Sequence, residues 1–183
     1  KTLIEQIDTL SHIATEFSNF AQMPKMVFEP VDLNEMLKNI VDFFAHSEGI
    51  ELEYIAPAEE KCLVMSDREQ LLRAFNNLVR NAIQSIPEER KGKITVQLRN
   101  EDSAWLVSVQ DNGSGIPEHI QEKIFYPNFT TRTGGMGLGL ALVKSIIESS
   151  EGSVWFSTVI SEGSIFYVQL PASNAALQKK QYP

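Results

Sequence analysis

Glycines are concentrated in one part of this 183-residue chain. Six of its ten glycines lie between residues 113 and 139. Glycine allows positive φ and lets backbone N–H groups come close to a ligand. The run Gly135-Met136-Gly137-Leu138-Gly139-Leu140 precedes an apolar periodic segment, so its free amides would meet the positive end of a helix dipole. This pattern predicts a site for an anionic group, with phosphate as the natural candidate.

Two familiar glycine motifs do not fit this spacing. Gly134 and Gly139 are separated by four residues, as in a P-loop, but Leu140 occupies the position of the phosphate-binding lysine. The dinucleotide-binding fingerprint needs a strand directly before its glycines, whereas a long irregular segment precedes Gly137. The spacing therefore argues against both a Walker-type site and a Rossmann site.

A second glycine turn follows an acidic residue. The run Asp111-Asn112-Gly113-Ser114-Gly115-Ile116-Pro117 places a carboxylate at the end of an alternating strand and then turns through two glycines. Such a carboxylate can accept a hydrogen bond from an exocyclic amine such as that of adenine. Asp111 is therefore the candidate for base specificity. The alternative is that it only begins an Asp-Asn-Gly turn.

Two asparagines could supply metal ligands. Asn77 and Asn81 are four residues apart on a predicted helix and share one of its faces. Their amide oxygens could ligate Mg²⁺ and leave room for water and phosphate oxygens. The alternative is a solvated polar face. Arg80 and Arg132 could neutralise phosphate, or they could be ordinary surface charges.

Hydrophobic periodicity predicts the elements that would position these residues. Helical stripes occupy residues 33–44, 67–86 and 136–150. Alternating or short apolar runs predict strands over residues 27–31, 50–56, 62–65, 94–98, 105–109, 153–159 and 164–170. Residues 112–135 lose this periodicity, as functional loops do. The pattern predicts an α/β fold, a two-layer sandwich in which three helices cover one face of a mixed sheet.

The first residues carry a heptad pattern instead. Its apolar positions are spaced alternately by four and three residues, at Leu3, Ile7, Leu10, Ala14, Phe17 and Ala21. We expect residues 1–24 to join an intermolecular helical bundle, with folding back onto the same domain as the alternative. Pro24 ends the pattern. We expect the main domain over residues 25–173 and a polar tail over residues 174–183.

Composition limits the classes of function. The chain has 24 acidic and 16 basic residues, a formal net charge of −8, which argues against nucleic acid as a partner. Its single cysteine and three scattered histidines predict neither an internal disulfide nor a Cys/His metal site. The sequence shows no membrane span or signal peptide, so we expect a cytoplasmic location. The chain does not begin with methionine, so we expect a longer parent whose membrane anchor could lie upstream.

Four segments together resemble the nucleotide-binding boxes of sensor histidine kinases. In order, these segments are residues 77–82 (Asn-Leu-Val-Arg-Asn-Ala), 111–116, 125–131 and 135–140. Sensor histidine kinases share a superfamily with DNA gyrase and with the chaperone and mismatch-repair ATPases. The resemblance covers residues 27–171. The Asn-Leu-Val-Arg-Asn-Ala and Phe-Thr-Thr-Arg segments are most similar to the nitrogen-regulation subgroup.

This resemblance implies a Bergerat fold that binds ATP beneath a mobile lid. Asp111 would hold adenine, Asn81 assisted by Asn77 would hold Mg²⁺, and Ser164 would lie near adenine through water. The glycines from 135 to 139 would shape the lid hinge and receive phosphates. The implied ATP-binding residues are Asn77, Asn81, Asp111, Gly113, Gly115, Ile116, Thr131, Arg132, Gly135, Gly137, Leu138, Gly139 and Ser164.

The sequence departs from the family pattern at two places. Gln84 replaces a lysine that many members use to contact phosphate, which leaves phosphoryl positioning to Asn77, Arg80 and Arg132. Tyr126-Pro127-Asn128-Phe129 replaces a more usual Pro-Phe-Phe sequence. We therefore expect Phe125 and Phe129 to anchor the lid.

The phosphoacceptor of such kinases is missing from this chain. The accepting histidine begins the first helix of a dimerising hairpin and is followed by an acidic residue and soon by Asn-Pro or Thr-Pro, which His12-Ile13-Ala14-Thr15 does not match. We interpret residues 1–24 as the second helix of that hairpin and His12 as a surface residue. The implied reaction transfers the γ-phosphoryl of ATP to a histidine on a separate helix. The implied partners are the acceptor helix, a homodimer partner and a response regulator receiver domain.

Two other functions remain as alternatives. Hydrolytic relatives of the gyrase or chaperone type carry a glutamate as general base at the position of Asn77, and an amide cannot take a proton from water. This difference favours the kinase. A degenerate nucleotide-sensing adaptor would fit Gln84 and the missing acceptor, but Asp111, Asn81 and the glycines argue against it.

Overall fold

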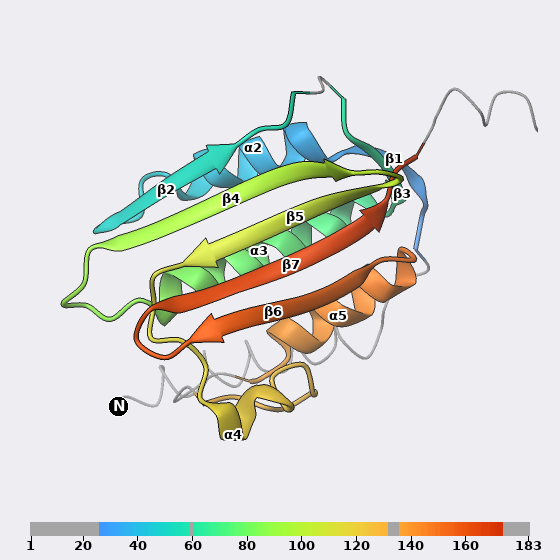
Figure 1. Cartoon of the computed structure of the whole chain (residues 1–183). Helices are drawn as coiled ribbons and strands as arrows, with labels where there is room; N and C mark the ends of the chain where they lie inside the picture. The colour runs from blue at the N-terminus through green and yellow to red at the C-terminus, as the bar shows by residue number, and fades with distance from the viewer. Residues whose placement is uncertain (1–25, 59–60, 132–135, 174–183) are drawn as a thin grey trace, which may run out of the picture.

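The computed structural model describes residues 26–58, 61–131 and 136–173 as an α/β fold (Figure 1). Its strands are β1 (Glu29–Asp32), β2 (Ile50–Ile55), β3 (Leu63–Ser66), β4 (Gly92–Glu101), β5 (Ala104–Asp111), β6 (Ser153–Val159) and β7 (Gly163–Pro171). Its helices are α2 (Leu33–Phe44), α3 (Arg68–Ser85), α4 (Glu118–Gln121) and α5 (Gly139–Ser149). The heptad segment and the polar tail of the sequence lie outside the described residues.

The main sheet contains five strands in the order β2-β4-β5-β7-β6. β2 runs parallel to β4, and the other neighbouring pairs are antiparallel. Figure 1 shows α2, α3 and α5 on one face of this sheet, which confirms the predicted two-layer sandwich with a mixed sheet. β1 and β3 do not join it, because they pair with each other in a separate antiparallel sheet of two strands.

Two aspartates fix where the first two helices begin. Asp32 caps α2, and its carboxylate accepts a hydrogen bond from the N–H of Asn34 at 3.0 Å. Asp67 caps α3 and accepts from the N–H groups of Gln70 at 3.0 Å and Val27 at 2.9 Å. Partial burial raises the pKa of Asp67, but its backbone donors outweigh this effect and leave the pKa below its ordinary value. The cap of α3 therefore keeps its charge at neutral pH.

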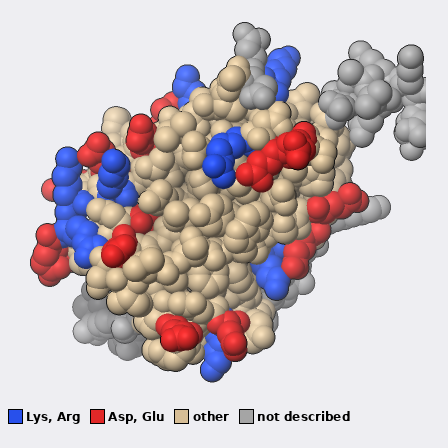
Figure 2. All heavy atoms as spheres, viewed as in Figure 1, with Lys and Arg blue, Asp and Glu red and all other residues tan. Residues whose placement is uncertain are grey.

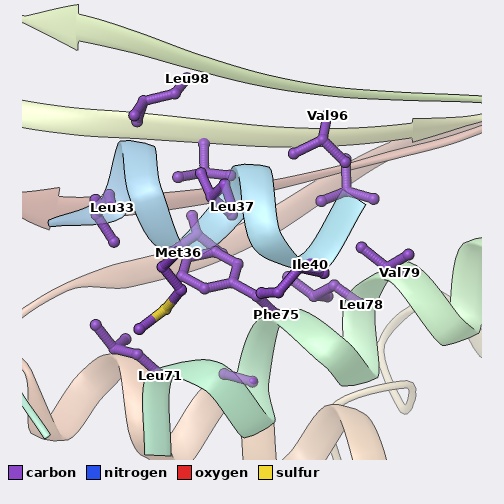
Figure 3. Close-up of a cluster of buried hydrophobic side chains, with 14 of the residues drawn as sticks. Leu33, Met36, Leu37, Ile40, Leu71, Phe75, Leu78, Val79, Val96 and Leu98 are labelled. Carbon is purple, nitrogen blue, oxygen red and sulfur yellow. The ribbon is translucent and has the colours of Figure 1, made fainter. Parts of the chain in front are cut away.

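An apolar cluster fills the space between the helices and the sheet (Figure 3). The largest of its fully buried side chains is that of Phe75 of α3, which has an exposed fraction of 0%. Figure 3 shows the neighbouring buried side chains from α2, α3 and β4, namely Leu33, Met36, Leu37, Ile40, Leu71, Leu78, Val79, Val96 and Leu98. The helical stripes and strand alternation of the sequence meet here, so this cluster fixes the position of α3.

The opposite face of the sheet is turned to solvent. In Figure 2 the charged side chains lie mainly around the margin of this face, and uncharged residues occupy its middle. On it Trp155 of β6 stacks on Tyr167 of β7 with ring centroids 5.4 Å apart. Within the described ranges, no helix combines the length and the apolar character needed to cross a bilayer.

We predict that Phe75→Ala lowers the free energy of unfolding by about 3–5 kcal/mol, because it leaves a cavity that the surrounding helices cannot fill. Urea denaturation followed by circular dichroism measures this loss. Phe43→Ala is the matched control, since Phe43 is 76% exposed and its ring lies edge-on to that of Phe44. It should cost less than about 1 kcal/mol. Equal losses in the two variants would contradict the assignment of Phe75 to the core.

Candidate functional site

Asp111 lies at the end of the central strand β5 and is 4% exposed. Its Oδ1 accepts hydrogen bonds from the Ser85 hydroxyl at 2.9 Å, the Gly113 N–H at 2.8 Å and the Ser164 N–H at 3.3 Å. These donors come from the end of α3, the glycine turn and the start of β7. The structure therefore brings together Asp111, Gly113 and Ser164, which the resemblance implies as members of one ATP site.

Hydrogen bonds hold the glycine turn after Asp111 on both sides. The Arg90 guanidinium donates to the carbonyl of Gly113 at 2.8 Å. The N–H of Ile116 donates to the Thr158 hydroxyl of β6 at 2.9 Å. Between them, a Cβ at Gly115 would lie 2.4 Å from a backbone oxygen of β6. The backbone of this turn thus has little freedom to move relative to Asp111.

Asn77, Asn81 and Ser85 follow one another at intervals of four residues along α3 and form a polar stripe. All three are half-buried. The amide nitrogen of Asn77 donates to the carbonyl of Arg73 at 3.0 Å, and a Cβ at Gly139 would lie 3.0 Å from the amide oxygen of Asn77. The stripe therefore runs from the first residue of α5 to the carboxylate of Asp111.

The N-terminus of α5 lacks a side-chain cap. Leu138 occupies the N-cap position, is 5% exposed and offers no side-chain hydrogen bond to the helix. The first N–H groups of a helix have no partners within it, so this end can receive an anion beside the amide of Asn77. Arg80 and Thr131 are exposed, whereas Arg132 and Gly135 lie outside the described residues.

The long segment between β5 and α5 is attached to the core at two places. Phe125 packs against Phe156 and Phe166 of the sheet, with ring centroids 6.1 and 6.4 Å away. Phe129 also packs on the core, as predicted for both anchors. Gly137 has φ +67°, and a Cβ there would lie 2.4 Å from the backbone of Phe129. Only glycine at position 137 allows the backbone there to lie so close to the backbone of Phe129. The short helix α4, which the sequence did not predict, lies within this loop.

Three polar residues of the site were not predicted from the sequence. Ser85, Arg90 and Thr158 each support Asp111 or the glycine turn across 22 to 42 residues of sequence. A single polar residue at a helix end or in a strand has no spacing that reveals such a long-range contact. Within the described ranges, no group of three or more histidine, cysteine or acidic side chains could hold a metal ion. The candidate metal ligands predicted from the sequence are instead the amide oxygens of Asn77 and Asn81.

Comparison with known proteins agrees with this arrangement. Residues 66–174 match the family described as histidine kinase-, DNA gyrase B- and HSP90-like ATPase. The chain is 31% identical over 175 residues to the sensor histidine kinase ZraS of Salmonella typhi, covering 93% of this chain and 37% of that protein. It is 31% identical over 160 residues to the nitrogen regulation protein NtrY of Azorhizobium caulinodans, covering 84% of this chain and 20% of that protein.

Solved structures show the same similarity. The catalytic domain of the histidine kinase ThkA is 33% identical, with a TM-score of 0.71 over 80% of this chain and 97% of that chain. ThkA in complex with the response regulator TrrA has a TM-score of 0.75 at 27% identity, covering 93% of this chain and 49% of that chain. The chain spans about 20% to 40% of the length of the curated relatives it matches.

Gly163 is the first residue of β7 and provides a test of how closely the start of this strand approaches Asp111. Its φ is +123°, and a Cβ there would lie 2.0 Å from the carbonyl oxygen of Asp111. At Gly49 φ is +72° but nothing lies within 4 Å of a Cβ, so Gly49→Ala measures backbone strain alone. We predict that Gly163→Ala costs about 1–3 kcal/mol more unfolding free energy than Gly49→Ala, because the sheet must shift as well. Equal losses in urea denaturation would contradict this close approach.

Proposed function

Because this chain belongs to the histidine kinase-, DNA gyrase B- and HSP90-like ATPase family, and its fold is that of a histidine kinase catalytic domain, we propose that it is the ATP-binding part of a sensor kinase that phosphorylates a histidine. One observation carries the proposal. The polar stripe of α3 links a buried carboxylate suited to a base with an uncapped helix end suited to phosphates.

The base end of the site is built for an exocyclic amine. In this proposal the carboxylate of Asp111 accepts a hydrogen bond from the amine of adenine. Gly113, Gly115 and Ile116 form the wall of the base pocket, and Ser164 lies beside the carboxylate. A guanine would present a carbonyl oxygen to the same carboxylate, so its repulsion would select adenine.

The phosphate end combines amides with a metal. Asn77 and Asn81 present side-chain amides on one face of α3, and such oxygens suit Mg²⁺. Because the Asn77 nitrogen donates to the carbonyl of Arg73, its oxygen is left to face α5. Bound Mg²⁺ would neutralise charge on the phosphates. The remaining proposed phosphate contacts are Arg80, Thr131, Arg132, Gly135, Gly137, Leu138 and Gly139.

Phosphoryl transfer itself depends mainly on positioning and electrostatic stabilisation. The proposed acceptor is a histidine on a separate helix of a dimeric bundle, to which residues 1–24 would contribute the second helix. Residues 25–173 would form the catalytic domain, which we place in the cytoplasm. The ThkA–TrrA complex supports a response regulator receiver domain as the next partner. Similarity to NtrY supports the nitrogen-regulation subgroup.

We predict that Asn81→Ala weakens binding of ATP with Mg²⁺ by at least about tenfold, because a metal ligand is lost. Its effect on ATP binding in excess EDTA should be smaller. Isothermal titration with and without the metal separates the two modes of binding. Asn76→Ala is the matched control on the same helix, five residues away and on another face, and it should preserve both affinities. Equal losses with and without Mg²⁺ in Asn81→Ala would instead indicate a packing role.

The kinase and the two alternative functions predict different fates for the γ-phosphate of bound ATP. We expect no steady release of phosphate by this chain alone, because the amide of Asn77 cannot act as a base toward water. With γ-labelled ATP and a separate hairpin that carries an acceptor histidine, we expect label on the hairpin. Asn81→Ala should abolish this transfer, which controls for contaminating kinases.

Two outcomes would reject this function. Steady ADP production by the chain alone, lost in Asn81→Ala, would indicate a hydrolase. Tight ATP binding with neither hydrolysis nor transfer to the hairpin would indicate a nucleotide-sensing adaptor.

A further inference from the structure

Ser85 is the last residue of α3 and occupies the end of the polar stripe nearest Asp111. Its hydroxyl lies 2.9 Å from the Oδ1 of Asp111 and 2.7 Å from the carbonyl oxygen of Ala82. A hydroxyl has one proton to donate, and a carboxylate is the stronger acceptor of the two. Acceptor strength therefore favours a charge-assisted hydrogen bond from Ser85 to Asp111.

The glycine turn is shaped around this serine. The carbonyl of Ser85 accepts from the N–H of Ser114 at 3.0 Å and from its hydroxyl at 3.3 Å. A Cβ at Gly113 would lie 2.1 Å from the Ser85 hydroxyl oxygen. The turn therefore passes directly against this side chain, and its backbone is hydrogen-bonded to the same residue. This close approach holds the Ser85 hydroxyl between the helix end and the carboxylate.

We infer that Ser85 is a positioning residue for adenine recognition, which acts by fixing the orientation of the Asp111 carboxylate. The inference rests on the proposed role of Asp111 in binding adenine. Ser85, Gly113 and Ser164 all donate to Oδ1, so the carboxylate plane is held from three directions. A carboxylate has about four acceptor positions, and Oδ2 is the oxygen we assign to the exocyclic amine. Ser85 donates from its side chain, whereas Gly113 and Ser164 donate from backbone N–H groups.

A pair of nucleotides isolates the amine contact. ATP and purine riboside triphosphate share the ring, the ribose and the triphosphate, and they differ in the 6-amino group. The ratio of their affinities therefore measures recognition of the amine and cancels contacts elsewhere in the site. A merely structural role of Ser85 would weaken both nucleotides by the same factor.

The experiment compares this ratio in the wild-type chain, Ser85→Ala and Ser66→Ala, by competition against a fluorescent ATP analogue. In Ser85→Ala we expect the preference for ATP to fall about tenfold, the effect of one hydrogen bond to a charged group. Ser66→Ala is the matched control, because Ser66 is a buried serine whose hydroxyl contacts Ser150 at 2.6 Å, outside the site. It should keep the wild-type preference. Circular dichroism verifies that each variant is folded.

Three outcomes decide the matter. An unchanged ratio in folded Ser85→Ala, with both affinities lowered equally, would overturn the positioning role and leave Asp111 in place. A wild-type chain that binds the two nucleotides equally would overturn the role of Asp111, and the inference with it. If Ser85→Ala does not fold, Ser85→Cys keeps the shape of the side chain with a weaker donor. Ser85→Cys should then prefer ATP over purine riboside triphosphate less strongly than the wild type does. A full wild-type preference would overturn the inference.

Discussion

The buried carboxylate of Asp111 is the constraint on which the rest of the site depends. Away from water, a carboxylate is stable only when protein groups donate hydrogen bonds to it. Its donors come from the end of α3, the glycine turn and the first residues of β7. These three segments must meet at one point. That requirement accounts for the glycines at positions 113 and 163, where a side chain would overlap Ser85 or the backbone of Asp111.

The helix α3 serves the core and the site at once, because residues four apart share a face. Phe75 and its apolar neighbours bury one face of the helix against α2 and the sheet. Another face carries Asn77, Asn81 and Ser85, which span a rise of about 12 Å along the axis. Packing of the apolar face holds this polar stripe at a fixed distance from both β5 and α5. The proposed base and phosphate contacts are therefore positioned by the same hydrophobic cluster that stabilises the domain.

Much of this arrangement could be predicted from the sequence, since it depends on local signals. Apolar periodicity located α2 and α3, and alternation located the strands of the two antiparallel hairpins. The pairing of β1 with β3 could not be predicted, because four-residue strands carry no information about their partners. The third helix was expected from residue 136 but begins at Gly139, after the left-handed Gly137. Ser85, Arg90 and Thr158 were missed because their contacts join segments distant in sequence.

The division between rigid and glycine-rich segments also suits the proposed chemistry. Asp111 lies on a central strand and Asn77 and Asn81 on a packed helix, and such elements hold functional groups more accurately than loops do. The loop between β5 and α5 is instead fixed by Phe125, by Phe129 and by the close contact of Phe129 with Gly137. In the proposed kinase, the residues that recognise the base are therefore in place before the acceptor helix arrives. The phosphate contacts lie beside the loop between β5 and α5, which would have to admit that helix.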